Sequence, residues 1–259
     1  MNSPINPRIR VRDAVPSDVP EFVEIYEAAF GPGVMDRLMY PGGMSQDAKE
    51  KFSTGFAGYL LSPEGASAAN AKSRSFDDYL KVAELLPDDN GNGGKKVVAF
   101  AKWHIRREPQ PEEVWNVQRE ATAESLGEGA NPEVHNQFIG GITRKRIEWT
   151  KGDPYVVLGL LATHPNYGRL GAATSLIRWG VEIMDREGLP GWLESSAAGW
   201  KIYKKFGFED VDVLDLDISK WNPTREDGDD WGENIAVEFA GPLRPGMHRV
   251  AMMRRPPKQ

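Results

Sequence analysis

The stretch from Leu160 to Gly207 constrains the fold of this chain more than any other part. It reads in order as an apolar strand, a loop with glycines, an amphipathic helix, a short strand (GWLESS) and a second helix ending in KIYKKFGFE. A loop that opens a helix presents main-chain N–H donors and the positive end of the helix dipole to one anionic group. The stretch therefore predicts a cradle for a diphosphate, with a tyrosine facing it.

The helix after this loop has the clearest periodicity in the chain. Gly188 is expected to end it as a left-handed cap, and Pro190 prevents its continuation. The apolar residues that recur on one helical face are Ala173, Leu176, Ile177, Gly180, Val181 and Met184.

Other segments have the period of strands or helices. Ser17 is expected to cap the first helix, and a change of apolar parity between Val213 and Leu214 predicts a β-bulge. Residues 62–75 are small and polar and indicate a loop. The predicted strands are 8–12, 78–86, 95–106, 155–163 and 248–254, the last antiparallel to the bulged strand, and the predicted helices are 19–30, 35–40, 46–61 and 134–149.

We expect a single α/β domain over residues 1–259, because a chain of this size can bury about 70–75% of its unfolded surface in one core. It contains a long helical insertion at 107–153 and a polar connection at 220–246. So long an excursion between strands is typical of a lid or a substrate-side wall. The acidic stretches at 209–217 and 226–233 are interpreted as solvated surface.

Composition excludes several classes of site. The chain has no cysteine and 4 histidines, which removes thiolate nucleophiles and argues against a metal centre. Its formal net charge of −6 disfavours nucleic-acid binding and favours a cationic small substrate. The amino terminus has no apolar signal segment, and no run approaches the roughly 20 apolar residues of a membrane span. We therefore expect a soluble cytoplasmic protein with no membrane partner.

Two motifs resemble those of the GNAT superfamily, the acyl-CoA-dependent N-acyltransferases. The family's cofactor loop runs Gln/Arg-x-x-Gly-x-Gly/Ala, and residues 168–173 (GRLGAA) match at its fourth and sixth positions but carry Gly168 at the first. The second motif, a tyrosine followed four residues later by Gly-Phe, is Tyr203 to Phe208. The PGGM segment at 41–44 and the long insertion are similar to fungal members.

The resemblance implies a mixed, mostly antiparallel central sheet flanked by helices, and acetyl-CoA as cofactor. It places a splayed strand with an exposed N–H at Leu161, Ala162 and Thr163, and it makes Tyr203 the general acid for the departing thiolate. A phenol suits that role because its ordinary pKa of about 10 exceeds that of a thiol. The residues expected to bind the cofactor are Leu161, Ala162, Thr163, Gly168, Arg169, Leu170, Gly171, Ala172, Ala173, Thr174 and Ser196.

The proton acceptor is less well defined by the sequence, because the strand 155–163 carries no carboxylate. Glu194 is the first candidate, His104 and His164 are weaker ones, and a water relay is an alternative. Ser195 and Ser196 are expected to hydrogen-bond a ligand or to cap the next helix. The aromatic residues proposed to line an acceptor pocket are Phe30, Trp103, Trp149 and Trp200.

The predicted reaction moves an acetyl group from acetyl-CoA to a primary amine of a small molecule or peptide by direct attack in a ternary complex. The protein is expected to act as a monomer or homodimer. A non-catalytic acyl-CoA sensor or interaction module on the same fold is the alternative. A dinucleotide-binding oxidoreductase is rejected, because Leu170 stands where that fingerprint needs a second glycine.

Overall fold

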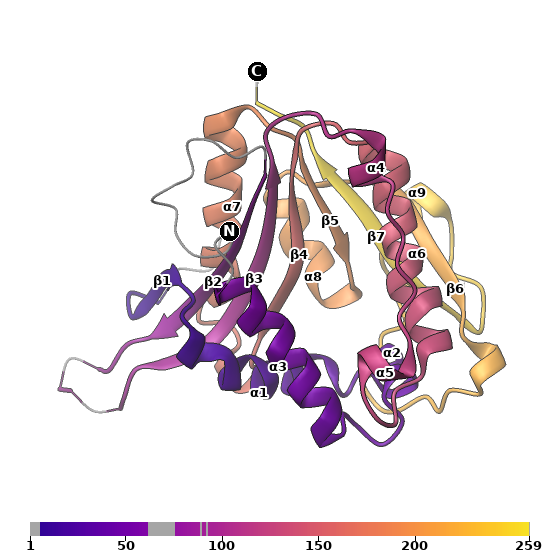
Figure 1. Ribbon diagram of the computed structural model, residues 1–259, viewed down its shortest axis with the longest axis horizontal. Helices are drawn as coiled ribbons and strands as arrows, with labels where there is room; N and C mark the ends of the chain where they lie inside the picture. Colours follow the sequence, from indigo (N-terminus) through magenta and orange to yellow (C-terminus); the bar gives the residue numbers. More distant parts are fainter. Residues whose placement is uncertain (1–5, 62–75, 89, 92, 259) are drawn as a thin grey trace.

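The computed structural model describes residues 6–61, 76–88, 90–91 and 93–258. Within this part, seven strands form one sheet in the order β1-β2-β3-β4-β5-β7-β6, antiparallel except for the pair β4 and β5 (Figure 1). The strands are β1 (Ile9–Asp13), β2 (Phe76–Leu85), β3 (Lys96–Arg106), β4 (Tyr155–Thr163), β5 (Gly191–Ser195), β6 (Glu209–Asp217) and β7 (Met247–Arg255).

The described helices lie on both faces of this sheet. They are α1 (Val19–Phe30), α2 (Val34–Met39), α3 (Gln46–Leu61), α4 (Glu112–Trp115), α5 (Ala123–Leu126), α6 (Pro132–Thr150), α7 (Ala172–Glu187), α8 (Ala197–Lys205) and α9 (Val237–Ala240). Short 3-10 turns lie at Pro16–Asp18, Pro165–Tyr167 and Ser219–Trp221.

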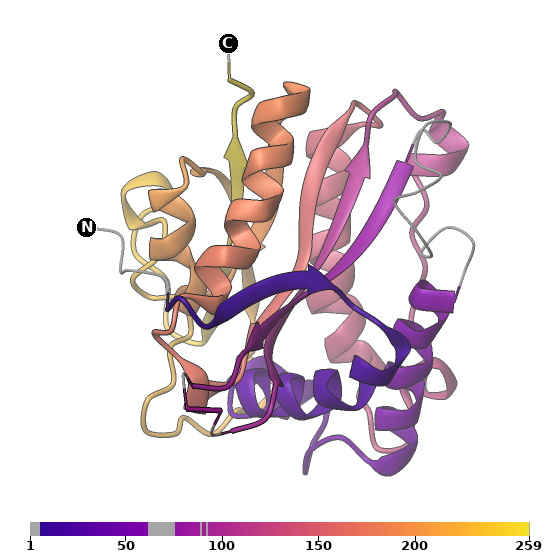
Figure 2. The same cartoon turned by 90° about the vertical axis from the view of Figure 1, so that its left-hand side faces the viewer.

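Two hydrophobic clusters divide the sheet into a back face and a front face. On the back face, α7 and α8 pack against the strands through residues such as Leu176 and Tyr203. On the front face, α1 and α3 cover β2 to β4 through Phe22 and Phe56, while α6 covers β5 and β6. Figure 2 shows α7 and α6 on opposite sides of the strands. A site between strands is therefore enclosed by helices from both sides.

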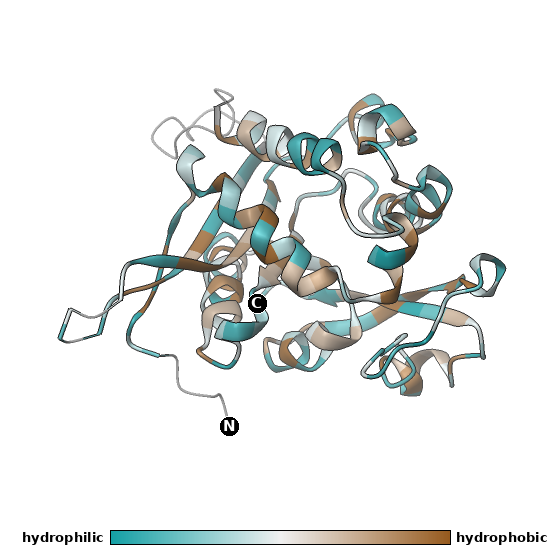
Figure 3. Ribbon diagram, turned by 90° about the horizontal axis from the view of Figure 1, so that it is seen from below, coloured by the Kyte–Doolittle hydropathy of each residue, from teal (hydrophilic) through white to brown (hydrophobic). Residues whose placement is uncertain are grey.

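A glycine in α7 explains how this helix lies so close to the sheet. Trp103 of β3 has no exposed surface. A Cβ at Gly180 would lie 2.3 Å from the Trp103 ring, so only glycine lets the ring pack flat under the helix. Figure 3 shows the mixed hydropathy that such helices need, with hydrophobic and hydrophilic residues on the same helix.

The predicted helix and strand positions are confirmed to within about two residues, and four finer features differ from the predictions or add to them. Ser17 does not cap α1, which continues from the 3-10 turn with Asp18 as its N-cap. The bulge in β6 lies between Asp210 and Asp212, not at Val213. Trp231 is buried within the polar connection. The acidic stretches are partly structural, since Asp215 pairs with the buried Arg249 at 2.6 Å. The predicted loop at 62–75 lies outside the described residues.

Candidate active site

Strands β4 and β5 separate halfway along their length. Their parallel pairing consists of Val156–Gly191, Val157–Trp192 and Leu158–Leu193 and stops there. Beyond this point β4 continues to Thr163 paired with β3 alone, while β5 continues paired with β7. The two strands diverge visibly in Figure 1. We call this divergence of the two strands the opening, and on its β4 side the main-chain edge of residues 160–163 has no strand partner toward β5.

A β-bulge lies at the start of this opening. Lys102 of β3 pairs with Leu160 and the next residue pairs with Leu158, so Gly159 is the extra residue on β4. Gly159 is exposed in an otherwise largely buried strand. The predicted irregularity at Leu161, Ala162 and Thr163 thus begins two residues after the bulge, because a strand bends where the unpaired residue is inserted.

The loop after β4 brings free main-chain donors to the same opening. Arg169 and Gly171 both have left-handed backbone conformations, with φ of 64° and 84°. This turn starts α7 at Ala172 without a side-chain cap. The N–H groups of Ala172, Ala173 and Thr174 lie in the first helical turn, where no earlier carbonyl of the helix is available. The positive end of the helix dipole lies there too, which gives the chemistry that a diphosphate requires.

One predicted donor in this loop is used elsewhere. The N–H of Gly168 donates to the carbonyl of Pro165 at 3.1 Å and closes the turn that precedes the loop. His164 belongs to the same turn, since its Nδ1 accepts from the N–H of Asn166 at 3.2 Å. Both residues therefore shape the loop, and Nε2 of His164 lies 3.7 Å from Oε1 of Glu24 on α1.

A buried hydroxyl at the end of β4 adds to the fit. Thr163 Oγ1 has no hydrogen-bond partner among the described residues although it is shielded from solvent. A buried polar atom without a partner is costly unless a ligand or water satisfies it. Ser196 lies across the opening at the start of α8, is exposed, and makes no capping bond with its side chain. Of these two hydroxyls, that of Ser196 belongs to an exposed residue.

Tyr203 lies on α8 behind the opening. It is 7% exposed, and its ring packs edge-on to Phe208 at 6.2 Å between centroids. Gly199 makes room for this ring, since a Cβ there would lie 2.6 Å from it. Burial raises the pKa of the Tyr203 phenol well above its ordinary value, and the negative charge of Glu194 raises it further. The phenol therefore stays protonated and is a hydrogen donor at neutral pH.

Glu194 is engaged in a two-point ion pair. Its Oε1 accepts from Nε of Arg146 at 2.8 Å and its Oε2 accepts from Nη2 at 2.5 Å. The Glu194 side chain is 9% exposed and that of Arg146 24% exposed. A carboxylate with both oxygens held by a guanidinium is poorly placed to take a proton from a substrate. The structure thus favours an electrostatic role for Glu194 over the predicted one.

The four aromatic residues predicted to line an acceptor pocket do not come together. Trp103 lies in the core and is a wrong prediction, because it has no exposed surface. Trp200 lies on α8 and donates to Asp210 at 2.7 Å. Phe30 packs against Tyr26 within α1. Trp149 is 43% exposed near the end of α6 and lines a hollow of its own.

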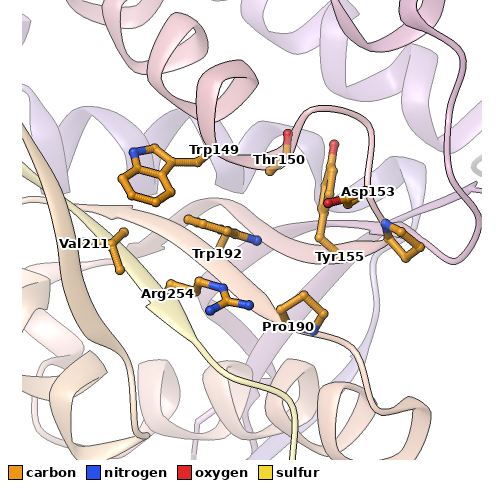
Figure 4. A pocket seen from close by; sticks show the side chains of 9 residues that line it. Trp149, Thr150, Asp153, Tyr155, Pro190, Trp192, Val211 and Arg254 are labelled. Atoms are coloured by element: carbon orange, nitrogen blue, oxygen red, sulfur yellow. The ribbon is translucent and has the colours of Figure 1, made fainter.

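That hollow has a volume of about 200 Å³ and lies where β4 and β5 begin. Figure 4 shows Trp149 above Trp192, with Arg254 beneath. The two indole rings are 6.0 Å apart, and the guanidinium of Arg254 lies 5.5 Å from Trp192. Tyr155, which also lines it, is four residues before the bulge, roughly 13 Å along the strand. The hollow is therefore separate from the opening.

The sequence did not single out Lys102, which lies on the front face beside the bulge. Its Nζ lies 3.5 Å from the centre of the Tyr59 ring, and no carboxylate of the described residues forms an ion pair with it. Burial lowers the pKa of Lys102 to about 8, with Arg146 and Arg106 lowering it and Asp78 opposing the change. Burial of a cation that no carboxylate contacts directly disfavours its charged form and costs stability.

We expect the substitution Lys102→Met to raise the free energy of unfolding by about 2 kcal/mol at pH 7, because the cost of burying the charge exceeds what its attraction to Asp78 and its contact with Tyr59 return. Since the folded-state pKa lies below that of the unfolded chain, the folded protein binds fewer protons between about pH 8 and 10.5, and wild-type stability rises there. The difference in the free energy of unfolding between variant and wild type should therefore become smaller above pH 8. Urea denaturation at several pH values measures this difference, and the substitution of the exposed Lys201 by methionine is the control. A Lys102→Met variant less stable than wild type at pH 7 would contradict the prediction.

Two further features bear on the type of site. No helix in the described part of the chain is long and apolar enough to cross a bilayer. Among the same residues, no group of three or more His, Cys, Asp or Glu is placed to hold a metal ion.

Comparison with known proteins agrees with this geometry. Residues 93–208 match the acetyltransferase (GNAT) family model. The matched segment runs from β3 to the residues after α8 and so contains the bulge, the cofactor loop and Tyr203. The seven-stranded mixed sheet flanked by helices confirms the predicted fold class. No protein of curated function matches the sequence.

Solved structures with the same fold cover nearly the whole chain. A protein described as a histone acetyltransferase HPA2 and related acetyltransferase, from Corynebacterium glutamicum, is 16% identical with a TM-score of 0.50, covering 97% of this chain and 98% of its own. Arylalkylamine N-acetyltransferase 2 from Aedes aegypti is 12% identical with a TM-score of 0.53, covering 96% and 98%. The polyamine N-acetyltransferase of Drosophila melanogaster is 11% identical with a TM-score of 0.53, covering 96% and 99%. At such identities these likenesses show the fold alone.

Proposed function

We propose that this protein transfers an acetyl group from acetyl-CoA to the primary amine of a small molecule or peptide, by direct attack while both substrates are bound. The observation that carries this proposal is the coincidence of three features at one opening. These are the divergence of β4 and β5, the uncapped first turn of α7, and a protonated Tyr203 behind it. The solved structures of similar fold include acetyltransferases named for amine acceptors.

Each part of the opening has a separate task in this proposal. Acetyl-CoA supplies the activated thioester. The N–H groups of residues 172–174 and the exposed Arg169 would hold its diphosphate, and each charge-assisted hydrogen bond contributes roughly 1.5–3 kcal/mol. The free main-chain edge of residues 160–163 would bind the pantetheine arm as an added strand does. Tyr203 would give a hydrogen to the leaving sulfur as negative charge develops on it.

Glu194 belongs to this site as a neighbour of Tyr203. Burial raises the pKa of the phenol, and the negative charge of Glu194 raises it further. Arg146 in turn fixes the position of the carboxylate. The proposal includes acetyl-CoA as the acyl donor, a primary amine as the acceptor, and the similarity of this chain to fungal members of the superfamily.

The experiment is a measurement of free thiol released from acetyl-CoA with a panel of primary alkylamines, arylamines and peptide amino termini, with CoA binding measured by calorimetry on the same preparation. We expect saturable CoA binding and thiol release with at least one class of amine. Binding without thiol release on any amine would favour a sensor of acyl-CoA, and absence of binding would overturn the proposal.

A further inference from the structure

A histidine and an aspartate meet on the front face at the edge of the opening. Nδ1 of His104 on β3 lies 2.7 Å from Oδ1 of Asp78 on β2. The same carboxylate oxygen accepts from Nη1 of Arg106 at 3.0 Å. A carboxylate bound to Nδ1 fixes the tautomer in which Nδ1 carries the hydrogen, so Nε2 is left as a lone-pair acceptor.

The free nitrogen of this histidine points at the bulge. A Cβ built on Gly159 would lie 2.9 Å from Nε2 of His104, so the nitrogen lies against the one residue of β4 that has no side chain. The polar contact of the His104 ring with a described residue is made by Nδ1, and none is made by Nε2. The His104 side chain is 17% exposed. Nε2 therefore faces Gly159 at the start of the opening.

The charged and titratable groups around His104 come from its own strand, β3, and from four other elements. Asp78 lies on β2, Lys102 and Arg106 on β3, Arg146 on α6 with its partner Glu194 on β5, and Tyr59 approaches from α3. Burial lowers the pKa of His104, Lys102 and Arg146 lower it further, and Asp78 opposes them. Burial raises the pKa of Asp78, but the bond from His104 and the charge of Arg106 lower it to about 2. The pair is thus a neutral imidazole beside an ionised carboxylate at neutral pH.

We propose that His104 is the proton acceptor for the acceptor amine, and that Asp78 is its positioning residue. The inference rests on the proposed acetyl transfer. Nε2 takes one proton from the substrate ammonium, the freed nitrogen lone pair forms the C–N bond to the thioester carbon as the C–S bond breaks, and the nitrogen then loses its second proton to solvent. The sulfur takes a proton from the Tyr203 hydroxyl, which regains one from solvent, while Nε2 releases its proton to solvent. The net products are the amide, the free thiol and one proton.

The test compares two classes of acceptor amine on one variant. His104→Asn keeps an amide nitrogen near the Nδ1 position for Asp78 and removes Nε2. An alkylamine is an ammonium ion at pH 7 and needs a proton acceptor, whereas an arylamine is already uncharged. We expect kcat/KM of the variant to fall about 100-fold with the alkylamine and less than about 3-fold with the arylamine, since general-base catalysis contributes 10²–10⁴-fold. His135→Gln, on α6 away from the opening, is the control and should change neither.

A second readout does not depend on turnover. The protein has 4 histidines, so long-range proton–nitrogen spectra of the labelled protein can be assigned by single substitution. We expect His104 to be neutral at pH 7 with the hydrogen on Nδ1, and Asp78→Asn to shift the population toward the other tautomer and lower the alkylamine rate about 10-fold. A His104 tautomer with the hydrogen on Nε2, or equal losses with both amine classes, overturns the inference alone. If wild-type protein releases no thiol with any amine, the proposed function falls and the inference falls with it.

Discussion

Replacing Tyr203 by phenylalanine is expected to lower kcat about 1000-fold, near the middle of the range for loss of one acid–base group. The substitution removes only the hydroxyl and keeps the ring that packs against Phe208 and fills the space over Gly199. The lost atom is the hydrogen donor to the departing sulfur, whose charge grows only in the transition state. The KM for acetyl-CoA and its affinity should therefore change little.

Thiol release and calorimetry with CoA on the same samples measure this separation of kcat from binding. Tyr79→Phe provides a control, because Tyr79 lies on β2 against Trp179, at 5.2 Å between ring centroids, and away from the opening. A variant with unchanged kcat would remove Tyr203 from the mechanism. A variant that loses CoA affinity and kcat together would assign the hydroxyl to binding.

The part of this site formed by one continuous segment was predictable from sequence. Gly171, its helix and Tyr203 follow one another along the chain, and local backbone conformation fixes how they are arranged. Gly159 also had a local signal, since a glycine inside a strand often marks a bulge. Only its exact partner on β3 was unknown, and that is why the irregularity was placed two residues too late.

The contacts between distant segments were not predictable in the same way. His104 meets Asp78 only because β2 and β3 pair in one register, and a register shift between Ala83 and Glu84 changes that register by one residue. A slip of one residue would turn Asp78 to the opposite face of the sheet. No periodicity in the sequences of the two strands indicates such a register shift.

Arg146, the partner of Glu194, comes from the long insertion, 48 residues earlier in the chain. The sequence suggested that the insertion forms a wall on the substrate side, yet it contained no signal that one of its arginines holds a carboxylate of β5. Glu194 therefore looked like a free base. In the structure Glu194 is one partner of a shielded ion pair, and the stability that this pair contributes can be measured.

Replacing Arg146 by methionine should lower the free energy of unfolding by about 3 kcal/mol, because it leaves the shielded carboxylate of Glu194 without its partner. Combining it with Glu194→Gln should recover much of that loss, since no uncompensated charge then remains. Urea denaturation of wild type, both single variants and the double variant gives the coupling energy of the pair. Lys51→Met, which breaks an exposed ion pair with Asp47 in α3, should cost no more than about 0.5 kcal/mol.

The double variant also decides between the two roles of Glu194. If Glu194 took the proton from the acceptor amine, a folded Arg146→Met/Glu194→Gln protein would lose about 100-fold or more in kcat with an alkylamine. If His104 takes that proton, as we propose, the loss should stay within about 10-fold, because Glu194 then acts only through the pKa of Tyr203. Without the Glu194 charge that pKa falls toward its ordinary value, which leaves the phenol protonated at pH 7 and still able to donate. A stable double variant with a large loss of kcat would therefore indicate that Glu194 is the proton acceptor, as the sequence suggested.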